Sequence, residues 1–528
     1  MLEAIYDKWK SRIVTGEETA PKPGLLNFFN AAPALDLLHK HLVSASKIAV
    51  HCDVDMDGLG SGYIVKRFIS SLTPTNQIYF INKEKEHGIQ PKHCDFFKAN
   101  PIDLLVILDS SSNEIETIRK FNCDVIIVDH HEVTQNETWG YTDDGHLFIL
   151  VNNTLDNLDT SVLSNWMKLN NPNTTEKFEP YNADSRMSCG LVIYELLRLY
   201  QEAYTTGPIL ENMMLYQWVG VTLLTDAIPL LSDRNQWYME KTVHSTYTEQ
   251  TLITIAKSLN QYATGLSKSL ISYTIAPTFN RAIRAGATSD VLNIIMDYPN
   301  YANTLQKYRE LQDWAIAEGI KDIDEHDSFI LKDLTNTGIR ASYTGVIAGK
   351  LCDEYNKNCV VFNVDNGIAK GSFRGRIQVS DYRKQFDEFN ATSKAQGHKV
   401  AFGFEARVED LPRIMKSLES VEDEIDSRKY LTIGSLPDNL KGKYHIEDIS
   451  EFKKCGGIMM LGIGNSKVSS DEQIMISVLS TEASLVEIRG KLYMYNILGL
   501  DCKAFKEIEP GMINIYVEQS KTLEFFVK

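Results

Sequence analysis

The fold is decided by the stretch IAVHCDVDMDG, residues 48–58, in which an apolar run leads into three aspartates, Asp53, Asp55 and Asp57. Short apolar runs of this kind are typical of strands that are buried on both faces of a parallel sheet. In open α/β sheets, ligands bind at the carboxyl ends of the strands. The stretch therefore predicts a buried strand that delivers acidic side chains to the functional edge of a sheet.

The same pattern, an apolar run that stops on an acidic residue, recurs three times along the chain. We interpret each run as a further buried strand, so that four distant segments bring carboxylates and imidazoles to one edge. Carboxylates held close together repel one another unless a cation neutralises them, and a divalent metal ion is the simplest such cation. The pattern therefore predicts a site for one or two metal ions. The three runs end at Asp109 after residues 104–108, at Asp129-His130-His131 after residues 125–128, and at Asp226 after residues 219–225.

The composition is that of a soluble globular protein with about three or four domains, since the chain has 528 residues, of which 43% are apolar and 23% charged. No run approaches the ~18 apolar residues of a membrane helix, and the first residues lack a secretory-type apolar core, so we expect a cytoplasmic protein. The net charge of −16 argues against a broad basic surface for nucleic acid, although it leaves room for a local groove. The eight cysteines include no CxxC pair, which argues against a zinc ribbon or a disulfide framework.

The order of patterns along the chain predicts five segments. Strand and helix patterns alternate in the first half, which favours a doubly wound parallel sheet. A charged, periodic stretch then predicts a long helix that joins this lobe to a second, smaller α/β lobe, and the last residues favour β structure. The predicted segments are a helical lead-in at residues 1–45, an α/β domain at 46–298, a connecting helix at 299–326, a second α/β domain at 327–428, and a C-terminal β domain of OB-like type at 429–528.

Local patterns predict particular elements within these segments. Residues 58–72 and 110–120 have helical patterns, and Ser and Asn residues at the start of the second are candidate helix caps. Residues 189–204 and 213–225 carry further apolar periodicity. Residues 158–181 are polar and rich in Asn, which is typical of a loop or insertion.

The acidic loop that follows the first strand has the side chains expected of a site for hard metal ions. Alternating Asp55 and Asp57 can reach two different ions, and His51 adds an imidazole. Carboxylate oxygens mixed with imidazole suit Mn²⁺ or Mg²⁺ better than a metal that prefers thiolates. The spacing is not that of an EF-hand, because no Glu stands at the twelfth position. A single strand-end aspartate is often only a helix cap, so the interpretation depends on the four segments together, and the role of Asp53 stays open.

With these residues in place, the chain resembles the DHH phosphoesterases, a family named after a triplet like Asp129-His130-His131. The spacing His51-xxx-Asp55-x-Asp57 is similar to the first motif of that family, and Asp109 is similar to its second. The stretch from Asp226 to Leu230 is similar to its fourth motif. Where the family commonly has a Cys-Gly pair after the second motif, this chain has three serines, and this departure removes no ligand.

The resemblance continues downstream and is closest to the RecJ-type exonucleases. Residues 276–280, followed by Arg284 and Gly286, are similar to the segment that closes the first lobe in those enzymes. Residues 369–374 and 397–404 are similar to the DHH-associated domain that faces the active site. Gln396 stands where the family often has a glycine, which also removes no ligand.

The resemblance implies a dinuclear site for Mn²⁺ or Mg²⁺ and assigns roles to particular side chains. His131 would contact the scissile phosphate, and Asp129 would orient a neighbouring imidazole, so that catalysis depends on these two together with Asp109 and His130. One ion would take His51, Asp55 and Asp109, and the other would take Asp57, Asp109, His130 and Asp226. The candidates for binding the phosphate and the end of the strand are Arg374 and His398, with Arg284, Lys370, Ser372 and Arg376 as further candidates.

The implied function is 5′-to-3′ exonuclease activity on single-stranded DNA in recombination, repair or replication. The chain would act as a monomer, with a helicase or a single-strand-binding protein as candidate partners. An oligoribonucleotide or cyclic-dinucleotide phosphodiesterase is the first alternative, and a non-catalytic replication scaffold of the same fold is the second. Residues 397–404 argue against a manganese-dependent pyrophosphatase. The preference for DNA or RNA stays open, as does base stacking by Tyr493, Tyr495 and Tyr516, which are as readily core residues.

Overall fold

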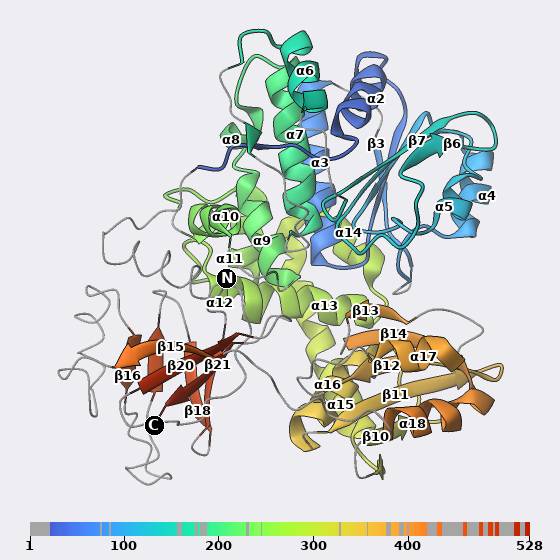
Figure 1. Cartoon of the computed structure of the whole chain (residues 1–528), viewed down its shortest axis with the longest axis vertical. Coiled ribbons are helices and arrows are strands. Elements are labelled where there is room, and N and C mark those ends of the chain that lie inside the picture. The colour runs from blue at the N-terminus through green and yellow to red at the C-terminus, as the bar shows by residue number, and fades with distance from the viewer. Residues whose placement is uncertain are drawn as a thin grey trace. The chain divides into compact units, whose positions relative to one another are not determined.

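The computed structural model describes residues 22–419 apart from short gaps, together with the backbone of seven strands in the C-terminal part. The gaps are residues 74–76, 84–85, 156–160, 175–177, 180–186, 227, 229–231, 244, 327–328, 356, 376–381, 390–394 and 399–400. The chain divides into two compact units (Figure 1). The first unit holds residues 1–280, 288–304 and 430–528, and the second holds residues 281–287 and 305–429.

The first unit is built on a six-stranded sheet with the strand order β3-β2-β4-β5-β7-β6, in which only the edge strand β6 is antiparallel. Val50 pairs with Val106, and Val106 pairs with Ile126, so the predicted runs lie side by side. These three predicted strands are therefore confirmed. The strands are β2 (Ile48–Cys52), β3 (Gln77–Phe80), β4 (Leu104–Leu108), β5 (Asp124–Asp129), β6 (Trp139–Tyr141) and β7 (Leu147–Asn152).

The strand order reverses between β2 and β4. The chain passes from β2 to β3 on one side, and then crosses to β4 on the other side of β2. Such a reversal is the topological switch point at which α/β sheets bind their ligands, at the carboxyl ends of the strands. The residues that follow β2 and β4 therefore lie at the position where this architecture usually binds its ligands.

Helices cover both faces of this sheet, as Figure 1 shows. On one face, Leu105, Ile107 and Ile127 are fully buried against α4 (Pro91–Ala99) and α5 (Ile115–Ile118). On the other face, apolar residues of β4 and β5 pack with α2, α3 and α7. Burial on both faces explains why the strands are continuous apolar runs. The helices of the second layer are α2 (Ala31–Val43), α3 (Met56–Leu72) and α7 (Cys189–Tyr204).

The predicted helix at 58–72 is confirmed as α3, and the apolar periodicity at 189–204 belongs to helix α7. The further helices of this unit are α6 (Ser161–Asn170), α8 (Ile209–Asn212), α9 (Tyr216–Thr225), α10 (Asp233–Val243), α11 (Gln250–Leu259), α12 (Lys268–Leu270), the π-helical turn η1 (Ile271–Ile275), α13 (Ala276–Arg284), which continues into the second unit, α14 (Thr288–Met296) and the 3₁₀ helix η2 (Pro299–Lys307). A short parallel pair joins β1 (Leu25–Leu26) to β8 (Phe178–Glu179). Within the part of the chain that the structure describes, no helix has the length and apolar character needed to cross a membrane.

The prediction of a strand at residues 219–225 is wrong, because these residues belong to helix α9. Trp218, Val219, Val221 and Leu223 are all fully buried, so the helix is enclosed on every side. A helix without a polar face lacks the periodicity that distinguishes it from a buried strand. Asp226 still follows the run, now as the residue that ends a helix.

Two other local predictions also need correction. The helix predicted at 110–120 is reduced to Ile115–Ile118, because Asp109 and Ser111 have φ angles of 65° and 73° and turn the chain before the helix begins. The loop predicted at 158–181 contains α6, whose apolar side chains Trp166 and Met167 are buried. Of the predicted helical lead-in, residues 31–43 form α2, and residues 1–21 lie outside the described residues.

The second unit contains a mixed sheet with the order β13-β14-β12-β11-β10-β9. Only β10 and β11 are parallel, and α16 connects them. One face packs against α15 (Tyr308–Gly319) and α16, and the other packs against α17 and α18. The elements are β9 (Asp324–Glu325), β10 (Phe329–Asp333), β11 (Asn358–Asp365), β12 (Ile368–Arg374), β13 (Gln396–His398), β14 (Ala401–Arg407), the 3₁₀ turns η3 (Ala341–Tyr343) and η4 (Val408–Asp410), α16 (Thr344–Tyr355), α17 (Arg383–Phe389) and α18 (Leu411–Glu419).

The long connecting helix predicted at 299–326 is shorter than expected. Residues 299–307 form the 3₁₀ helix η2, and the α-helix α15 spans only Tyr308–Gly319. A 3₁₀ segment is a tighter coil that is used as a connector, which explains why the periodic pattern extends beyond the α-helix.

The C-terminal part has the predicted β structure in its described backbone. Its strands form three antiparallel groups, β15-β20-β21, β16-β17 and β18-β19. The OB-like fold and the roles of its tyrosines stay predictions. The strands are β15 (Tyr430–Ser435), β16 (Ile458–Leu461), β17 (Met475–Val478), β18 (Ser484–Ile488), β19 (Lys491–Tyr495), β20 (Met512–Val517) and β21 (Leu523–Val527).

Candidate metal centre

The loop after β2 places two aspartates at the start of α3. Asp55 caps the helix, since its Oδ1 accepts hydrogen bonds from the backbone N–H groups of Asp57 (2.9 Å) and Gly58 (3.1 Å). An aspartate in this position satisfies donors that the first helical turn leaves without partners. The cap fixes where α3 begins and therefore where Asp57 stands.

Asp57 is buried and held by the N-terminus of another helix. Its Oδ2 accepts from the backbone N–H of Cys189 at 2.7 Å, and its Oδ1 accepts from that of Gly190 at 2.8 Å. These are the first two residues of α7. Burial and the charges of Asp226 and Asp55 nevertheless raise the pKa of Asp57 well above its usual value. The negative charge around Asp57 thus exceeds what two backbone donors neutralise.

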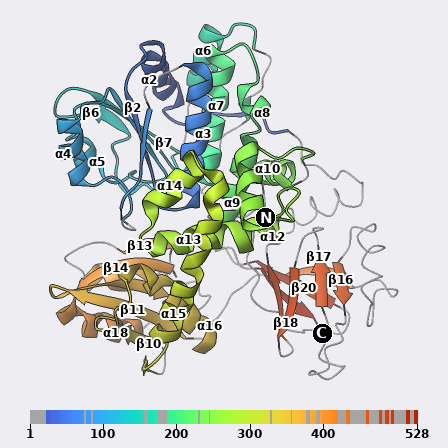
Figure 2. The ribbon, with the colours of Figure 1, turned by 180° about the vertical axis from the view of Figure 1, so that it is seen from behind.

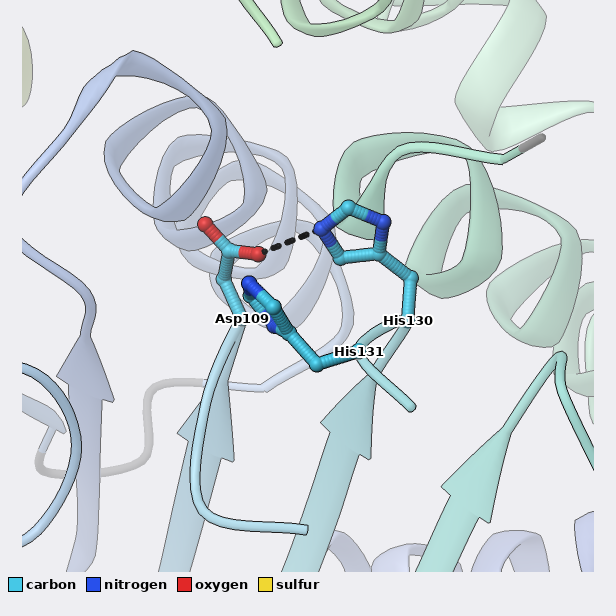
Figure 3. Close-up of side chains that lie close together, drawn as sticks. All are labelled: Asp109, His130 and His131. Atoms are coloured by element: carbon cyan, nitrogen blue, oxygen red, sulfur yellow. Dashed lines mark ion pairs between the residues drawn. The ribbon is translucent and has the colours of Figure 1, made fainter. Parts of the chain in front are cut away.

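The ring of His130 faces carboxylates from three different elements. Its Nε2 lies 3.1 Å from Oδ1 of Asp109, 3.7 Å from Oδ2 of Asp57 and 3.8 Å from Oδ2 of Asp226. Figure 3 shows the Asp109 carboxylate and the His130 ring pointing toward one another from the ends of adjacent strands. Burial lowers the pKa of His130, although the charge of Asp226 acts in the opposite direction. A neutral imidazole in this position can offer a lone pair to a metal ion.

Asp109 stands at the centre of the acidic cluster. It is buried, and its φ of 65° is a left-handed conformation that Asp and Asn adopt more readily than other side-chain-bearing residues. Burial and the charges of Asp57 and Asp55 raise the pKa of Asp109 well above its usual value. Carboxylates that raise one another's pKa in this way favour a bound cation, because the cation stabilises their charged forms.

Among the described residues, three groups of side chains share members. Within each group, the potential ligand atoms all lie within 4.8 Å of one another. Such spacing suits coordination of one ion by several residues, and the overlap suits two neighbouring ions. Five of the six predicted metal ligands belong to these groups. The groups are Asp57-His130-Asp226, Asp53-Asp55-Asp109 and Asp109-His130-His131.

His51, the sixth predicted ligand, is fully buried but belongs to none of these groups. Burial lowers its pKa to about 3, so the ring is neutral. Neither ring nitrogen has a hydrogen-bond partner among the described residues. A buried polar group without a partner is costly, and a metal ion would relieve that cost. The group that contains Asp55 and Asp109 includes Asp53 in place of His51.

Asp129 holds both residues of the histidine pair, His130 and His131, through hydrogen bonds. Its Oδ1 accepts from the backbone N–H groups of His130 (2.7 Å) and His131 (3.2 Å), and it lies 2.8 Å from Nδ1 of His131. Burial alone would raise the pKa of Asp129, but the charge and hydrogen bond of His131 hold it far below its usual value. Burial lowers the pKa of His131, but Asp129 outweighs it and raises the pKa to about 9. Asp129 therefore fixes the ring of His131, and it belongs to none of the candidate metal groups.

The sequence interpretation missed His87, which pairs with Asp53. Nδ1 of His87 lies 3.0 Å from Oδ2 of Asp53, whose Oδ1 accepts from the backbone N–H of Gly88 at 3.2 Å. The ring of His87 also packs edge-on against His131, with 5.0 Å between the ring centroids. The one available signal was Asp53, an acid in the motif without an assigned role. Asp53 thus has a partner of its own besides its place in a candidate metal group.

Three predicted substrate-binding residues of the second unit lie on β12. Lys370, Ser372 and Arg374 alternate along this strand and therefore point to the same face of the sheet. Oγ of Ser372 lies 2.9 Å from Oγ1 of Thr344, the first residue of α16. Lys370 forms an ion pair of 2.8 Å with Glu405.

Arg284 is close enough to Arg374 to influence its pKa. Burial and the charge of Arg284 lower the pKa of Arg374, and burial also lowers the pKa of Arg284. Neither guanidinium forms an ion pair with a carboxylate of the described residues, and Arg284 instead donates to Oε1 of Gln312 at 3.0 Å. Such a pair favours an anion. Arg376 and the side chain of His398 lie outside the described residues.

A family comparison agrees with the geometry of the first unit. Residues 47–144 match the model of the DHH family, N-terminal domain. This stretch includes His51, the three aspartates after it, Asp109 and the triplet that begins at Asp129. The chain contains a DHH domain. The predicted resemblance to DHH phosphoesterases is thereby confirmed.

The DHH domain and the remainder of the chain are similar to RecJ-type proteins. YorK of Bacillus subtilis (strain 168), whose name describes a prophage-derived single-strand DNA-specific exonuclease, is 23% identical over 513 residues, which cover 88% of this chain and 79% of YorK. RecJ from Thermus thermophilus, solved in complex with Mn²⁺, has a TM-score of 0.61 and 17% identity and covers 98% of this chain and 75% of that one. Its complex with Mg²⁺ has a TM-score of 0.57 and 16% identity and covers 98% and 74%. The chain therefore has a RecJ-like fold.

Proposed function

We propose that this chain is a metal-dependent 5′-to-3′ exonuclease that hydrolyses phosphodiester bonds of single-stranded DNA in recombination, repair or replication. The observation that carries the proposal is the convergence of Nε2 of His130 with carboxylates from β4, α3 and the end of α9. A simple cap or turn does not need three carboxylates from distant segments around one imidazole. The likeness to YorK, which is named for activity on single-stranded DNA, supports the choice of substrate in this proposal.

The donor set fits two divalent ions such as Mn²⁺ or Mg²⁺. We assign one ion to Asp57, Asp109, His130 and Asp226, and the other to Asp55, Asp109 and His51. Three of the first four form one of the compact groups, and the ring nitrogens of His51 are buried without partners among the described residues. When bound, a pair of such ions lowers the pKa of a water molecule and neutralises charge on the phosphate.

His131 binds the scissile phosphate in this proposal. Asp129 holds its Nδ1, which leaves Nε2 of the ring to donate outward, and 44% of the side chain is exposed. A donor that is fixed in advance stabilises developing charge on phosphate oxygens without reorganisation. Asp129 acts through His131 and does not touch the substrate.

In this proposal, a phosphate of the strand is bound by Arg374, Arg284 and Ser372. Two guanidiniums that have no carboxylate partner among the described residues, next to a serine hydroxyl, offer the donors that a phosphate accepts. Lys370 is a weaker candidate, because Glu405 already neutralises it. Arg376 and His398 stay candidates by resemblance. The same proposal includes a helicase or a single-strand-binding protein as the partner that delivers the strand.

The proposal is tested with Mn²⁺ and single-stranded DNA labelled at either end, with a dinucleotide and a cyclic dinucleotide in parallel. We expect the 5′ label to be released as mononucleotide, and the 3′-labelled strand to shorten step by step. Asp109→Asn should be inactive, whereas Asp144→Asn, which removes an exposed carboxylate elsewhere, should be fully active. Cleavage of only the short substrates would favour the dinucleotide phosphodiesterase, and Mn²⁺ binding without any cleavage would favour the scaffold.

A further inference from the structure

Thr222 of α9 fills a space that two glycines leave open. A Cβ atom added to Gly60 of α3 would lie 2.6 Å from Cγ2 of Thr222. A Cβ atom added to Gly190 of α7 would lie 2.3 Å from Oγ1, 2.6 Å from Cγ2 and 2.8 Å from Cβ of Thr222. Real Cβ atoms do not approach other atoms so closely, because interiors are packed at van der Waals distances. The two helices can therefore approach Thr222 only because both positions are glycine.

The three helices that meet at Thr222 also carry the parts of one candidate metal group. Figures 1 and 2 show α3 and α7 side by side, with α9 at their lower ends. Asp57 stands in α3 one turn before Gly60, and the N–H groups that hold it belong to the first turn of α7. Asp226 follows α9, and its backbone N–H donates to the carbonyl oxygen of Thr222 at 3.0 Å.

The hydroxyl of Thr222 makes a second connection. Its Oγ1 lies 2.9 Å from Oγ of Ser188, which caps α7 by accepting from the backbone N–H of Leu191. Ser188 immediately precedes the two residues that donate to Asp57. The side chain of Thr222 is thus in contact with both structures that position Asp57, one turn away from Asp226.

We infer that Thr222 is a positioning residue that sets the spacing between Asp57 and Asp226 and, through it, the affinity for the ion that these two share with His130. The inference rests on the proposed two-metal function and assigns a role to a residue that touches no ligand atom. Extra atoms in a well-packed contact force neighbouring backbone to shift. A metal site tolerates such shifts poorly, because its ligands must be held within about 0.5 Å of the productive geometry.

The test is Mn²⁺ binding to the full chain, measured by calorimetry and by the electron paramagnetic resonance signal of free Mn²⁺. We expect Gly60→Ala to weaken one of two Mn²⁺ sites at least 10-fold and to leave the other unchanged. The Mn²⁺ concentration needed for half-maximal nuclease activity should rise, while kcat at saturating Mn²⁺ stays near the original value. Gly349→Ala is the matched control, since Gly349 is also helical and nothing lies within 4 Å of its added Cβ.

Second-site variants make the test specific for Thr222. Adding Thr222→Ala to Gly60→Ala removes Cγ2 and should restore Mn²⁺ affinity to that of Thr222→Ala alone. The same addition should not restore Gly190→Ala, because the Cβ of residue 222 would still lie 2.8 Å from the new atom. Thr222→Ala alone leaves a gap and breaks the contact with Ser188, so it should weaken one Mn²⁺ site about threefold even if Gly60→Ala does not fold.

The outcomes separate this inference from the proposed function. A wild-type chain that binds no Mn²⁺ would contradict the proposed function. Two Mn²⁺ sites with unchanged affinity in Gly60→Ala and in Thr222→Ala, despite a lower melting temperature, would contradict the role of Thr222 and leave the proposed function intact. Rescue of Gly190→Ala by Thr222→Ala would also contradict it, because the rescue would not follow the contact geometry.

Discussion

The candidate metal centre draws its side chains from two kinds of element, and the two differ in how they are held. Asp109 and His130 follow neighbouring parallel strands, so the hydrogen bonds of the sheet fix their separation. Asp57 and Asp226 belong to helices, and packing between helices fixes their position. Strand-borne ligands therefore depend on a rigid frame, whereas helix-borne ligands depend on contacts that single methyl groups can disturb.

The largest effect is expected at the strand-borne Asp109. Asp109→Asn should reduce nuclease activity on the order of 10³-fold or more, because this carboxylate is shared by both proposed ions. The fold should survive, since Asn accepts the left-handed φ of 65° as readily as Asp does. Steady-state kinetics measure the loss of activity, and circular dichroism measures whether the fold survives. Substantial activity in a folded Asp109→Asn variant would contradict the assignment of Asp109 as the ligand that both proposed ions share.

A smaller loss is expected at the helix-borne Asp226, whose side chain is 25% exposed at the rim of the site. Asp226→Asn should reduce activity roughly 10²-fold and weaken one Mn²⁺ site, because the remaining ligands of that site persist. Titration of activity with Mn²⁺ separates a loss of affinity from a loss of kcat. A loss as complete as that of Asp109→Asn would remove the distinction between the two kinds of ligand.

The second unit extends the comparison to the residues that we propose bind the substrate and that belong to none of the candidate metal groups. Arg374→Ala should raise KM for long single-stranded DNA roughly 10- to 100-fold with little change in kcat, as expected when a charge-assisted hydrogen bond is lost. Lys370→Ala is the control from the same strand, because Lys370 is exposed and paired with Glu405. Equal effects of the two substitutions would argue against a specific phosphate site at Arg374.

The smallest expected effect is a change in folding stability on substitution of Asp124. This residue lies at the opposite end of β5 from His130. Burial alone would raise its pKa, but hydrogen bonds from His41 and Lys40 hold it well below the usual value. A carboxylate with a lowered pKa stabilises the fold above its unfolded pKa of about 4 and loses that contribution as pH falls toward the folded value. Asp124→Asn should therefore be less stable than wild type at pH 7, and the difference should shrink below about pH 4.

Urea unfolding at pH 7, 5 and 3 measures this difference, with Asp144→Asn as the exposed control. Activity at pH 7 should not change, since Asp124 lies at the amino end of the strand, away from the candidate centre. A stability difference that stays constant with pH would mean that the charge of Asp124 contributes nothing and that only its shape matters.

The contrast between strands and helices also explains what the sequence could predict. Asp109 and His130 were identified together with their strands, because an apolar run buried on both faces has a recognisable pattern. Asp226 was identified through its motif, but its element was wrong, since α9 is buried on every side. His87 was missed, because its contact with Asp53 joins the loop after β3 to the loop after β2 and leaves no local pattern.

The wide spacing of the candidate ligands along the chain has a consequence for how the protein folds during synthesis. The side chains of the candidate centre are spread from the loop after β2 to the end of α9, so most of the first unit must be made before the last of them leaves the ribosome. Bringing such distant segments together requires closure of long loops, which is slow compared with local folding. A nascent chain therefore cannot assemble the complete set of candidate ligands before α9 has been made, and the proposed nuclease activity requires that whole stretch to have folded.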